Sequence, residues 1–472
     1  METDQDMSAA ASATFDSRMI LARLDRLPAT RHVWQLVAIL SLGGMFEFYD
    51  LFQTAYVIPG LVKAGLLTNV SVGIFTGPAL FVASTFAGLF IGTFVFGFAA
   101  DKYGRRAIFT WSMLWYSLAN LIMAFMPTGE LVCLMRLVAG IGIGVELVTI
   151  DTFVAELVPK TLRGRAFAVN QMVQFSVVPV VAFLAYLLVP QQPLGLDGWR
   201  WVAIIGSAGA LVVWVLRRGL PESPRWLINQ ARVTEADQIT RALEAAVSRD
   251  LGGAALPAPA THSEEKHEKL GSFAEIWQPP YGKRTTMLMV FQFFQTFGFY
   301  GFAAWVPTLI TKQTGINLQT SLLYSFIIAI ANPFGPALAI LFADKIERKW
   351  QLVGAAIGIA VFGMIFSQQT EMELLIALGV LITLSNNILS YSFHGYQSEL
   401  FPTRIRARAI GFTYSFSRIS TVFASFIIGW FLNQAGSTGV FGLIAFAMLM
   451  VVLSIGIFGP RTKDLELEEI SH

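Results

Sequence analysis

Apolar runs long enough to cross a membrane follow one another along almost the whole chain. Each has roughly 18–27 residues, and about 20 are enough for a helix to span the hydrocarbon core of a bilayer. The runs occupy 34–59, 74–99, 107–126, 131–157, 166–189, 200–216, 286–310, 318–342, 350–367, 374–398, 409–432 and 438–458. The sequence therefore predicts an all-α integral membrane protein with twelve transmembrane helices.

Composition supports this class. Hydrophobic residues make up 55% of the chain and charged residues 14%, with a mean hydropathy of +0.60, which is too apolar for an ordinary soluble protein. The single cysteine, Cys133, lies in an apolar run, so neither a disulfide framework nor a cysteine metal site can form. The chain also contains no nucleophile motif, phosphate loop or zinc spacing. We therefore expect no enzyme, no cofactor, no metal and no nucleic-acid partner.

Two short motifs recur at one distance along the chain. Asp101-Lys102 returns as Asp344-Lys345, and the Glu-x-x-Pro motif at Glu156 returns at Glu399, so both repeats are 243 positions apart. A shared offset indicates an internal duplication of about half the chain. Transporters are commonly built from two such repeats with the substrate site at their interface. The prediction is two pseudo-symmetric six-helix bundles.

The distribution of lysine and arginine predicts the orientation in the membrane. With the N-terminus inside, all but five of the 33 Lys and Arg residues fall in cytoplasmic segments. Both termini are therefore expected in the cytoplasm, and the polar N-terminus is expected to be a tail rather than a signal peptide. The predicted organisation is an N-terminal tail (1–33), a first bundle (34–216), a cytoplasmic linker with amphipathic helices (217–284), a second bundle (285–459) and a C-terminal tail (460–472).

Several motifs resemble those of a known superfamily. The pattern Gly-x-x-x-Asp-Lys-x-Gly-Arg-Arg over 97–106 resembles the most widespread signature of the major facilitator superfamily, although the second copy has Glu347 in place of the later Gly. Pro-Glu-Ser-Pro-Arg over 221–225 resembles the sugar-porter and organic-ion-porter branch, and Glu47-Phe-Tyr-Asp50 resembles the first helix of metabolite:proton symporters. The resemblance covers about 30–460 and implies secondary transport by alternating access.

Charged residues at the predicted inner helix ends are candidates for a gate. Asp101 and Arg105 at one helix end, with Glu156 and Arg163 at another, are predicted to form ion pairs across the inner mouth. Such a lattice would favour one of two rigid-body arrangements. The alternative is that these charges only set topology. The full predicted network is Asp101, Arg105, Arg106, Glu156, Arg163, Glu222, Arg225, Asp344, Arg348, Glu399 and Arg406.

Ionisable residues inside the apolar runs are functional candidates, because each is expensive in a bilayer. Glu47 and Asp50 are three positions apart and share one helical face. Two carboxylates this close in a low dielectric cannot both carry charge cheaply, so one is expected to hold and release a proton. Either could be the proton carrier of a symporter. The alternative is a fixed ion pair, for example with Arg136, that only holds helices together.

Three further residues are predicted to take part in proton coupling. Glu146 and Asp151 lie in the fourth run, and His394 lies in the tenth. Asp151 and His394 are related by the 243-residue offset, which predicts a pseudo-symmetric acid and imidazole in the inner half of the cavity. A purely structural role for His394 is the alternative.

Arg418 is the leading candidate for substrate binding. An arginine near the middle of a bilayer is costly, keeps its charge, and presents a planar fork that matches a carboxylate. Its equivalent in the first half is Phe175, so the duplication does not account for it. It resembles the arginine that organic anion porters of the superfamily often carry in span eleven. The alternative is a salt bridge to Glu47, Asp50 or Glu146.

The seventh run combines aromatic and amide side chains. Gln292, Gln295 and Phe299 share one helical face and Tyr300 adjoins it, an arrangement that suits a planar or amphipathic ligand. The other residues predicted to line the substrate site are Gln171, Gln174, Asn387 and Arg136.

The leading hypothesis is a proton-coupled symporter that imports a small organic anion, such as an aromatic or other monocarboxylate. It is expected to be a monomer in the bacterial inner membrane, with substrate, protons and lipid as its partners. Within transport, the alternatives are an uptake carrier for a sugar or an organic cation and a proton/drug antiporter. The charge density in the predicted cavity argues against a sugar. A nutrient sensor that has kept the transporter fold is the alternative from another class.

Overall fold

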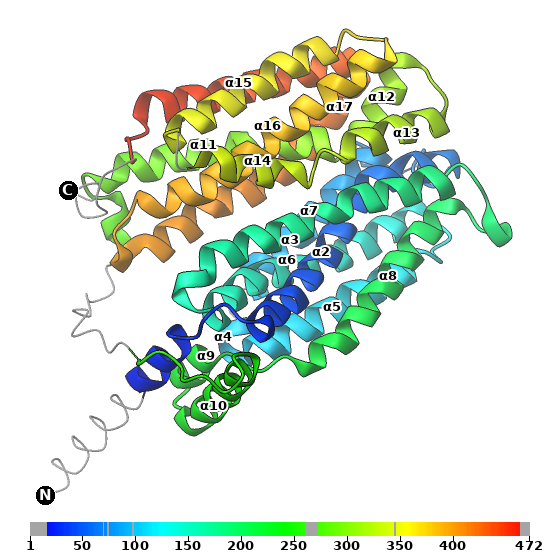
Figure 1. Ribbon diagram of the computed structural model, residues 1–472. Coiled ribbons are helices and arrows are strands. Elements are labelled where there is room, and N and C mark those ends of the chain that lie inside the picture. Colours follow the sequence, from blue (N-terminus) through cyan, green and yellow to red (C-terminus); the bar gives the residue numbers. More distant parts are fainter. Residues whose placement is uncertain are drawn as a thin grey trace, which may run out of the picture.

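The computed structural model describes residues 17–68, 70–72, 75–96, 99–259, 272–343 and 346–462, and it consists almost entirely of helices in two halves (Figure 1). The long helices of the first half are α2 (Arg31–Lys63), α3 (Gly77–Phe96), α5 (Arg105–Met123), α6 (Gly129–Leu157), α7 (Arg163–Leu188) and α8 (Gly198–Leu216). Those of the second half are α11 (Tyr281–Ala303), α12 (Val306–Thr314), α13 (Leu318–Ala329), α14 (Phe334–Ala343), α15 (Arg348–Phe366), α16 (Met372–Glu399) and α17 (Thr403–Phe458). A short antiparallel pair, β1 (Ser71–Val72) and β2 (Phe75–Thr76), precedes α3.

Two crossings of the second half are interrupted, and a third break separates two successive crossings within α17. α11 and α12 form one span bent by 64°, and residues 330–333, ending in Pro333, separate α13 from α14. α17 leaves helical geometry at Gly436, whose φ of 62° and ψ of −159° suit a glycine. The chain reverses direction there, so both ends of α17 lie near the start of α15. Gly459, just after α17, accepts a hydrogen bond from Lys349, and Glu399, just before α17, pairs with Arg348.

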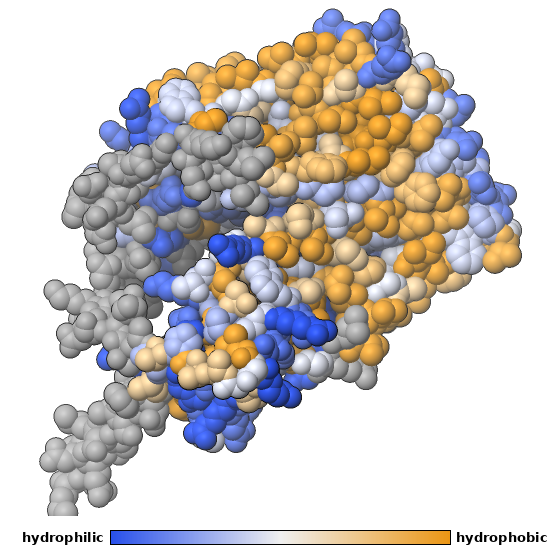
Figure 2. Space-filling view, in the orientation of Figure 1, coloured by the Kyte–Doolittle hydropathy of each residue, from blue (hydrophilic) through white to orange (hydrophobic). Residues whose placement is uncertain are grey.

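The predicted membrane fold is confirmed. Nine described helices are long and apolar enough to cross a bilayer, or ten with the bent pair. That total counts α17 once and omits α5, whose Trp, Tyr, Ser and Asn residues lower its hydropathy. Counting α17 as two crossings and adding α5 gives six crossings in each half. Figure 2 shows apolar side chains over the flank of the molecule and hydrophilic side chains towards its ends.

Close packing inside the first half depends on glycine. α3 and α6 meet through glycines, where a Cβ added at Gly88 would lie 2.2 Å from the Leu137 carbonyl oxygen and one at Gly144 would lie 2.3 Å from that of Leu89. Small residues of this kind allow transmembrane backbones to approach each other.

Two linker helices sit at one end of the first half. They are α9 (Pro224–Asn229) and α10 (Val233–Asp250), and the segment 272–280 contains the short helix η4 (Phe273–Trp277) before α11. Ser223 caps α9 by accepting a hydrogen bond from the Trp226 amide at 3.1 Å. The N-cap of α10 is Arg232. Residues 17–25 form a further helix, and both ends of the described chain lie at this same end of the molecule (Figure 1).

Candidate functional site: a central cavity between the halves

One cavity of about 640 Å³ lies between the two halves. Its walls come from α2, α6 and α7 of the first half and from α11, α15, α16 and α17 of the second half. It reaches Gly164 and Arg348, which lie at the first turns of α7 and α15, so it extends to the end of the bundle that carries α9 and α10. Figure 2 shows a hollow between the halves there. We call this end the near side and the opposite end the far side.

Arg418 forms part of the cavity wall. Its residue is only 3% exposed, and its Nη2 donates to the Tyr414 hydroxyl at 3.1 Å. The guanidinium carbon also lies 4.9 Å from the centre of the Tyr414 ring. Among the described residues, no carboxylate lies within 4.0 Å of Arg418, and its Nε has no hydrogen-bond partner. The alternative of a salt bridge to Glu47, Asp50 or Glu146 is therefore not found in this conformation.

The paired acids of α2 have different surroundings. Glu47 is 1% exposed, lines the cavity, and its Oε1 has no hydrogen-bond partner among the described residues. Asp50 is not part of the cavity lining. Its Oδ1 accepts a hydrogen bond from Arg136 at 2.8 Å and another from Gln53. The geometry thus matches the alternative of an ion pair for Asp50, and leaves Glu47 facing the cavity.

Arg136 does not contact the cavity, contrary to its predicted place in the substrate site. Beyond Asp50, its guanidinium donates to Thr85 at 3.0 Å, to Asn120 at 3.0 Å and to Thr54 at 2.6 Å. A fully buried guanidinium needs partners of this kind, because an unpaired charge in the interior is strongly destabilising. The cluster joins α2, α3, α5 and α6 inside the first half.

Glu146 also forms an ion pair away from the cavity, although it was predicted to take part in proton coupling. Its Oε1 lies 2.5 Å from Nη2 of Arg217, and its Oε2 accepts a hydrogen bond from Ser112 at 3.3 Å. The Arg217 guanidinium stacks 3.4 Å from the centre of the Phe109 ring. This role of Arg217 could not be predicted, because an Arg-Arg pair after the sixth span is equally typical of a cytoplasmic flank.

Asp151 and His394 both line the cavity, from α6 and α16. Both side chains are accessible from the cavity, and Nδ1 of His394 lies 2.7 Å from the Ser390 carbonyl oxygen. Both therefore belong to the cavity wall, while their pseudo-symmetric pairing and their part in coupling stay predictions.

Amide side chains lie on both sides of the cavity. Gln171, Gln174 and Gln295 contact it directly. Gln292 is outside the lining and instead supports Gln295, whose Nε2 donates to it at 3.4 Å; Gln292 in turn donates to Gln397 at 3.2 Å. Gln292 faces α16 rather than the cavity, which differs from its predicted direct contact with substrate.

Aromatic rings close the far-side end of the cavity. We call Phe48, Phe52, Phe175 and Phe299 the aromatic floor. Phe175 contacts the other three, with ring centres 5.1 Å from Phe48, 6.4 Å from Phe52 and 6.4 Å from Phe299. Tyr300 adjoins the floor, 5.0 Å from Phe299, and also lines the cavity. Asn387 lies beyond the floor and not in the cavity, so its predicted direct contact with substrate there is not observed.

The near-side charges of the first half pair with one another. Arg105 lies 3.1 Å from Glu156. The carboxylate of Glu222 accepts from the backbone amides of Arg105 and Arg106, each at 3.1 Å, and so caps the start of α5. Arg225 donates to the Glu156 carbonyl at 3.2 Å.

The matching charges of the second half likewise stay within that half. Arg348 pairs with Glu399, and Arg406 donates to the Phe401 carbonyl at 3.0 Å. These near-side ion pairs each stay within one half, and they include the predicted pair of Arg105 with Glu156, while the rest of the predicted lattice stays a prediction. Asp344 and the side chain of Asp101 lie outside the described part of the chain.

The helix at 17–25 contributes charges that the sequence did not point to. Asp25 pairs with Arg225 at 2.7 Å and with Arg163 at 3.6 Å. Arg23 bonds to Glu244 of α10. Burial opposes ionisation of Glu244, but hydrogen bonds from Arg23 and Arg26 outweigh it and hold the pKa of Glu244 below its usual range.

Comparison with known proteins gives a consistent result. The family model described as "Sugar (and other) transporter" matches residues 36–472. The chain is 30% identical to the putative metabolite transport protein YdjK of Escherichia coli, covering 95% of this chain and 96% of that one. It is 28% identical to the putative metabolite transport protein YyaJ of Bacillus subtilis, over 94% and 96% of the two chains. It is 27% identical to the niacin transporter NiaP of Acinetobacter baylyi, over 96% and 99%.

Solved structures show the same fold. The partially occluded inward open conformation of the xylose transporter XylE from E. coli matches with a TM-score of 0.74 at 20% identity, over 92% of this chain and 99% of that one. Its inward open conformation matches with a TM-score of 0.71 at 21% identity, over 93% and 99%. The relatives are transporters and not enzymes. This multi-pass membrane protein therefore belongs to the sugar (and other) transporter family of the major facilitator superfamily.

Proposed function

We propose that the protein is a proton-coupled symporter that imports a small organic anion, in particular an aromatic or other monocarboxylate. The observation that carries the proposal is Arg418, a guanidinium in the cavity wall with no carboxylate within 4.0 Å among the described residues. Removing one partner of a buried ion pair costs about 3–5 kcal/mol, so a buried guanidinium without an anion strongly favours an anionic ligand. A substrate carboxylate would supply the missing partner through the planar fork.

The size and lining of the cavity support an aromatic acid. A volume of about 640 Å³ is within the usual range of small-molecule sites. The aromatic floor offers ring faces and edges, and Gln171, Gln174 and Gln295 offer hydrogen bonds to polar substituents. The relative NiaP of A. baylyi is named as a transporter of niacin, an aromatic monocarboxylate.

Glu47 is the preferred proton carrier in this proposal. It faces the cavity and its Oε1 has no partner, so binding and releasing a proton there breaks no ion pair. Asp50 could serve only if its bonds to Arg136 rearranged. Asp151 and His394 are accessible at the cavity wall and would relay protons towards the near side.

Orientation and environment belong to the same proposal. We propose that the near side faces the cytoplasm; this is supported by the positive-inside rule, because the near side holds both ends of the described chain and the basic helix ends. The cavity would then be open to the cytoplasm in this conformation. We propose a monomer in the bacterial inner membrane.

A sugar is the second candidate, on one observation. Three glutamines line the cavity, and neutral sugars are bound mainly through amides and hydroxyls. One relative is the arabinose-proton symporter of B. subtilis, at 25% identity over 94% of this chain. In that case the charges of Arg418 and Glu47 would balance each other across the cavity, and neither side chain would bind the substrate.

Uptake into proteoliposomes tests the proposal. Labelled benzoate, nicotinate, shikimate, choline and glucose are compared with and without an inward proton gradient. We expect gradient-driven accumulation of an acid, little transport of its neutral amide, and a rise in KM of about a hundredfold in Arg418→Lys, because ammonium cannot reproduce the bidentate fork. Arg241→Lys, on an exposed face of α10 with 71% of its side chain accessible, is the matched control. Equal transport of acid and amide, or preference for choline or glucose, would refute the anion proposal.

A further inference from the structure

A buried ion pair next to Glu47 has no role in the proposed proton path. Arg217, which follows α8, reaches into the first half and holds Glu146 of α6 at 2.5 Å through Nη2. Its Nη1 donates to the Phe109 carbonyl oxygen of α5 at 2.5 Å. The third nitrogen, Nε, is buried and has no hydrogen-bond partner among the described residues. A buried N–H of a charged group is costly without a partner, so Nε is available for an acceptor.

A glycine on α2 lets this guanidinium lie against the helix. A Cβ added at Gly43 would lie 1.5 Å from Nη2 of Arg217 and 2.7 Å from its Nε, so a larger residue would displace the guanidinium. Glu47 is one turn farther along α2 on the same face. Because helical side chains lean towards the N-terminus of their helix, the Glu47 side chain leans towards the turn of Gly43. The Glu47 carboxyl and the Arg217 guanidinium are therefore neighbours.

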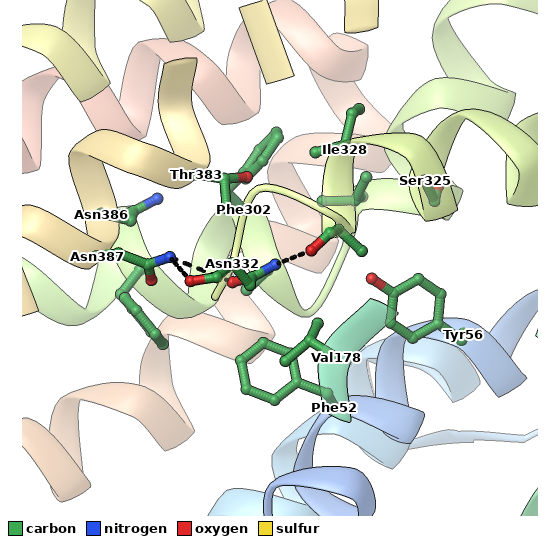
Figure 3. Close-up of a pocket in the computed structure, with 14 residues that line it drawn as sticks. Phe52, Tyr56, Val178, Phe302, Ser325, Ile328, Asn332, Thr383, Asn386 and Asn387 are labelled. Carbon is green, nitrogen blue, oxygen red and sulfur yellow. Dashed lines mark hydrogen bonds between the residues drawn. The ribbon is translucent and has the colours of Figure 1, made fainter. Parts of the chain in front are cut away.

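The two neighbours have complementary unpartnered atoms. Oε1 of Glu47 is buried without a partner among the described residues, and it can accept the bond that Nε of Arg217 can donate. The unpartnered atom of Asn386 is different, because it is a neutral amide oxygen in a pocket of about 30 Å³ beyond the aromatic floor. The adjoining Asn387 donates to the Asn332 carbonyl oxygen in that pocket (Figure 3). A neutral oxygen cannot balance a change of charge at Glu47, whereas an adjacent guanidinium can.

The other charged or titratable side chains around Glu47 come from four helices. They are Glu146 and Asp151 of α6, Arg418 of α17, Tyr116 of α5 and Tyr300 of α11. The two acids oppose a negative charge at Glu47, and the tyrosines are neutral at physiological pH. Arg418 faces the cavity and is assigned to the substrate in the proposed function. Arg217 is left as the cation that can balance Glu47 whether or not substrate is bound.

We propose that Arg217 is a counter-ion shared by Glu146 and Glu47, and that it enables Glu47 to release its proton. The inference rests on the proposed function, because it assigns a partner to the proton carrier named there. While Glu47 is protonated, Arg217 pairs with Glu146 alone. When the O–H bond of Glu47 breaks, the proton passes to water in the cavity, and the new carboxylate accepts a hydrogen bond from Nε while Nη2 stays on Glu146. Arg217 is thus a positioning residue that acts through Glu47.

Infrared titration of the purified protein tests the inference without any substrate. The band of protonated carboxyl that is lost in Glu47→Gln gives the titration midpoint of Glu47. Glu146→Gln leaves Arg217 without its acid, so the guanidinium should turn to Glu47. We expect the midpoint to fall by about 1–3 pH units, the usual effect of an adjacent opposite charge. An unchanged midpoint in Glu146→Gln would overturn the inference.

Neighbouring glycines of α2 separate direct contact from a general effect of charge. Gly43→Ala, added to Glu146→Gln, displaces the guanidinium and should cancel most of the shift without changing any charge. Gly44→Ala is the matched control, because its Cβ would lie 2.3 Å from Nε2 of Gln174 instead, and it should leave the shift in place. The inference fails if the shift survives Gly43→Ala, or if Gly44→Ala cancels it equally.

The pH dependence of transport tests the link to coupling. In Glu146→Gln, the pH profile of nicotinate or benzoate exchange should move towards acid by the same 1–3 pH units, about as far as the infrared midpoint. Adding Arg217→Gln makes both positions neutral and should move the profile back. A loss of activity that is equal at every pH, with an unmoved profile, would indicate a purely structural pair and contradict the proposal. If neither acid is transported by wild type, the proposed function fails, while the infrared titration still decides whether Arg217 is the counter-ion of Glu47.

Discussion

A close contact between the halves on the far side predicts how the transporter can be biased. Gly429 in the first part of α17 faces Ala79 at the start of α3, and a Cβ added at Gly429 would lie 2.5 Å from the Cβ of Ala79. Carbon atoms in contact normally stay about 3.5–4.0 Å apart. Gly429→Ala therefore forces α3 and α17 apart by about 1 Å or more wherever the far side is closed.

The magnitude follows from the cost of overpacking. Inserting a methyl group into a well-packed interface costs about 1–3 kcal/mol. The clash disappears when the far side opens, so this free energy shifts the equilibrium between the two conformations by about 5- to 150-fold. Gly429→Ala should favour the conformation that is closed on the near side.

The assay follows access to the cavity from the near side. A single cysteine at Ala168, which lines the cavity, is labelled in a Cys133→Ser background. Gly429→Ala should slow this labelling, at most by the factor given above. Adding Ala79→Gly removes the opposing methyl group and should restore the rate. Unchanged labelling in the single variant, or no recovery in the double variant, would refute the reasoning.

Three further outcomes are expected. Glu47→Gln should abolish proton-driven accumulation of substrate and leave some exchange, and full accumulation in this variant would remove Glu47 from coupling. Asp50→Asn strands the Arg136 charge and should lower stability by about 3–5 kcal/mol, whereas adding Arg136→Met should recover most of it in thermal unfolding; a double variant as unstable as the single one would contradict this. The pKa of Glu244 is lower in the folded protein than in the unfolded chain, where it is about 4.3. Glu244 therefore stabilises the docking of the N-terminal helix fully above about pH 4.3, and this stabilisation is lost as the pH falls through the folded pKa. Hydrogen exchange of that helix, corrected for intrinsic rates, should be constant from about pH 7 to 5 and faster below about pH 4.

Periodicity and repetition predict the architecture well. The length of each apolar run and the shared 243-residue offset indicate two six-helix halves, because both reflect bilayer thickness and backbone geometry. The break at Pro333 escapes a hydropathy pattern, since it interrupts a predicted run without adding charge, whereas the turn at Gly436 falls between the predicted runs 409–432 and 438–458.

The candidate site is less predictable, because sequence shows which charges are buried but not how they pair. Arg136 and Glu146 were assigned to the cavity, yet each has a partner within the first half. The partner of Glu146 is Arg217, which hydropathy places in a cytoplasmic flank. Arg418 could be singled out because no acid occupies an equivalent position, and the structure indeed leaves it without a carboxylate within 4.0 Å among the described residues.

The docking of the N-terminal helix has a consequence for biosynthesis. Arg23 and its partner Glu244 are 221 residues apart, so about 10–45 s of translation separate them at about 5–20 residues per second. All six helices of the first half leave the ribosome during that interval, before the linker helix that this segment needs. The near face of the first half is thus completed only when α10 has emerged and before α11 is synthesised. The order of synthesis allows the first half to be assembled and closed off before the second half competes for its surfaces.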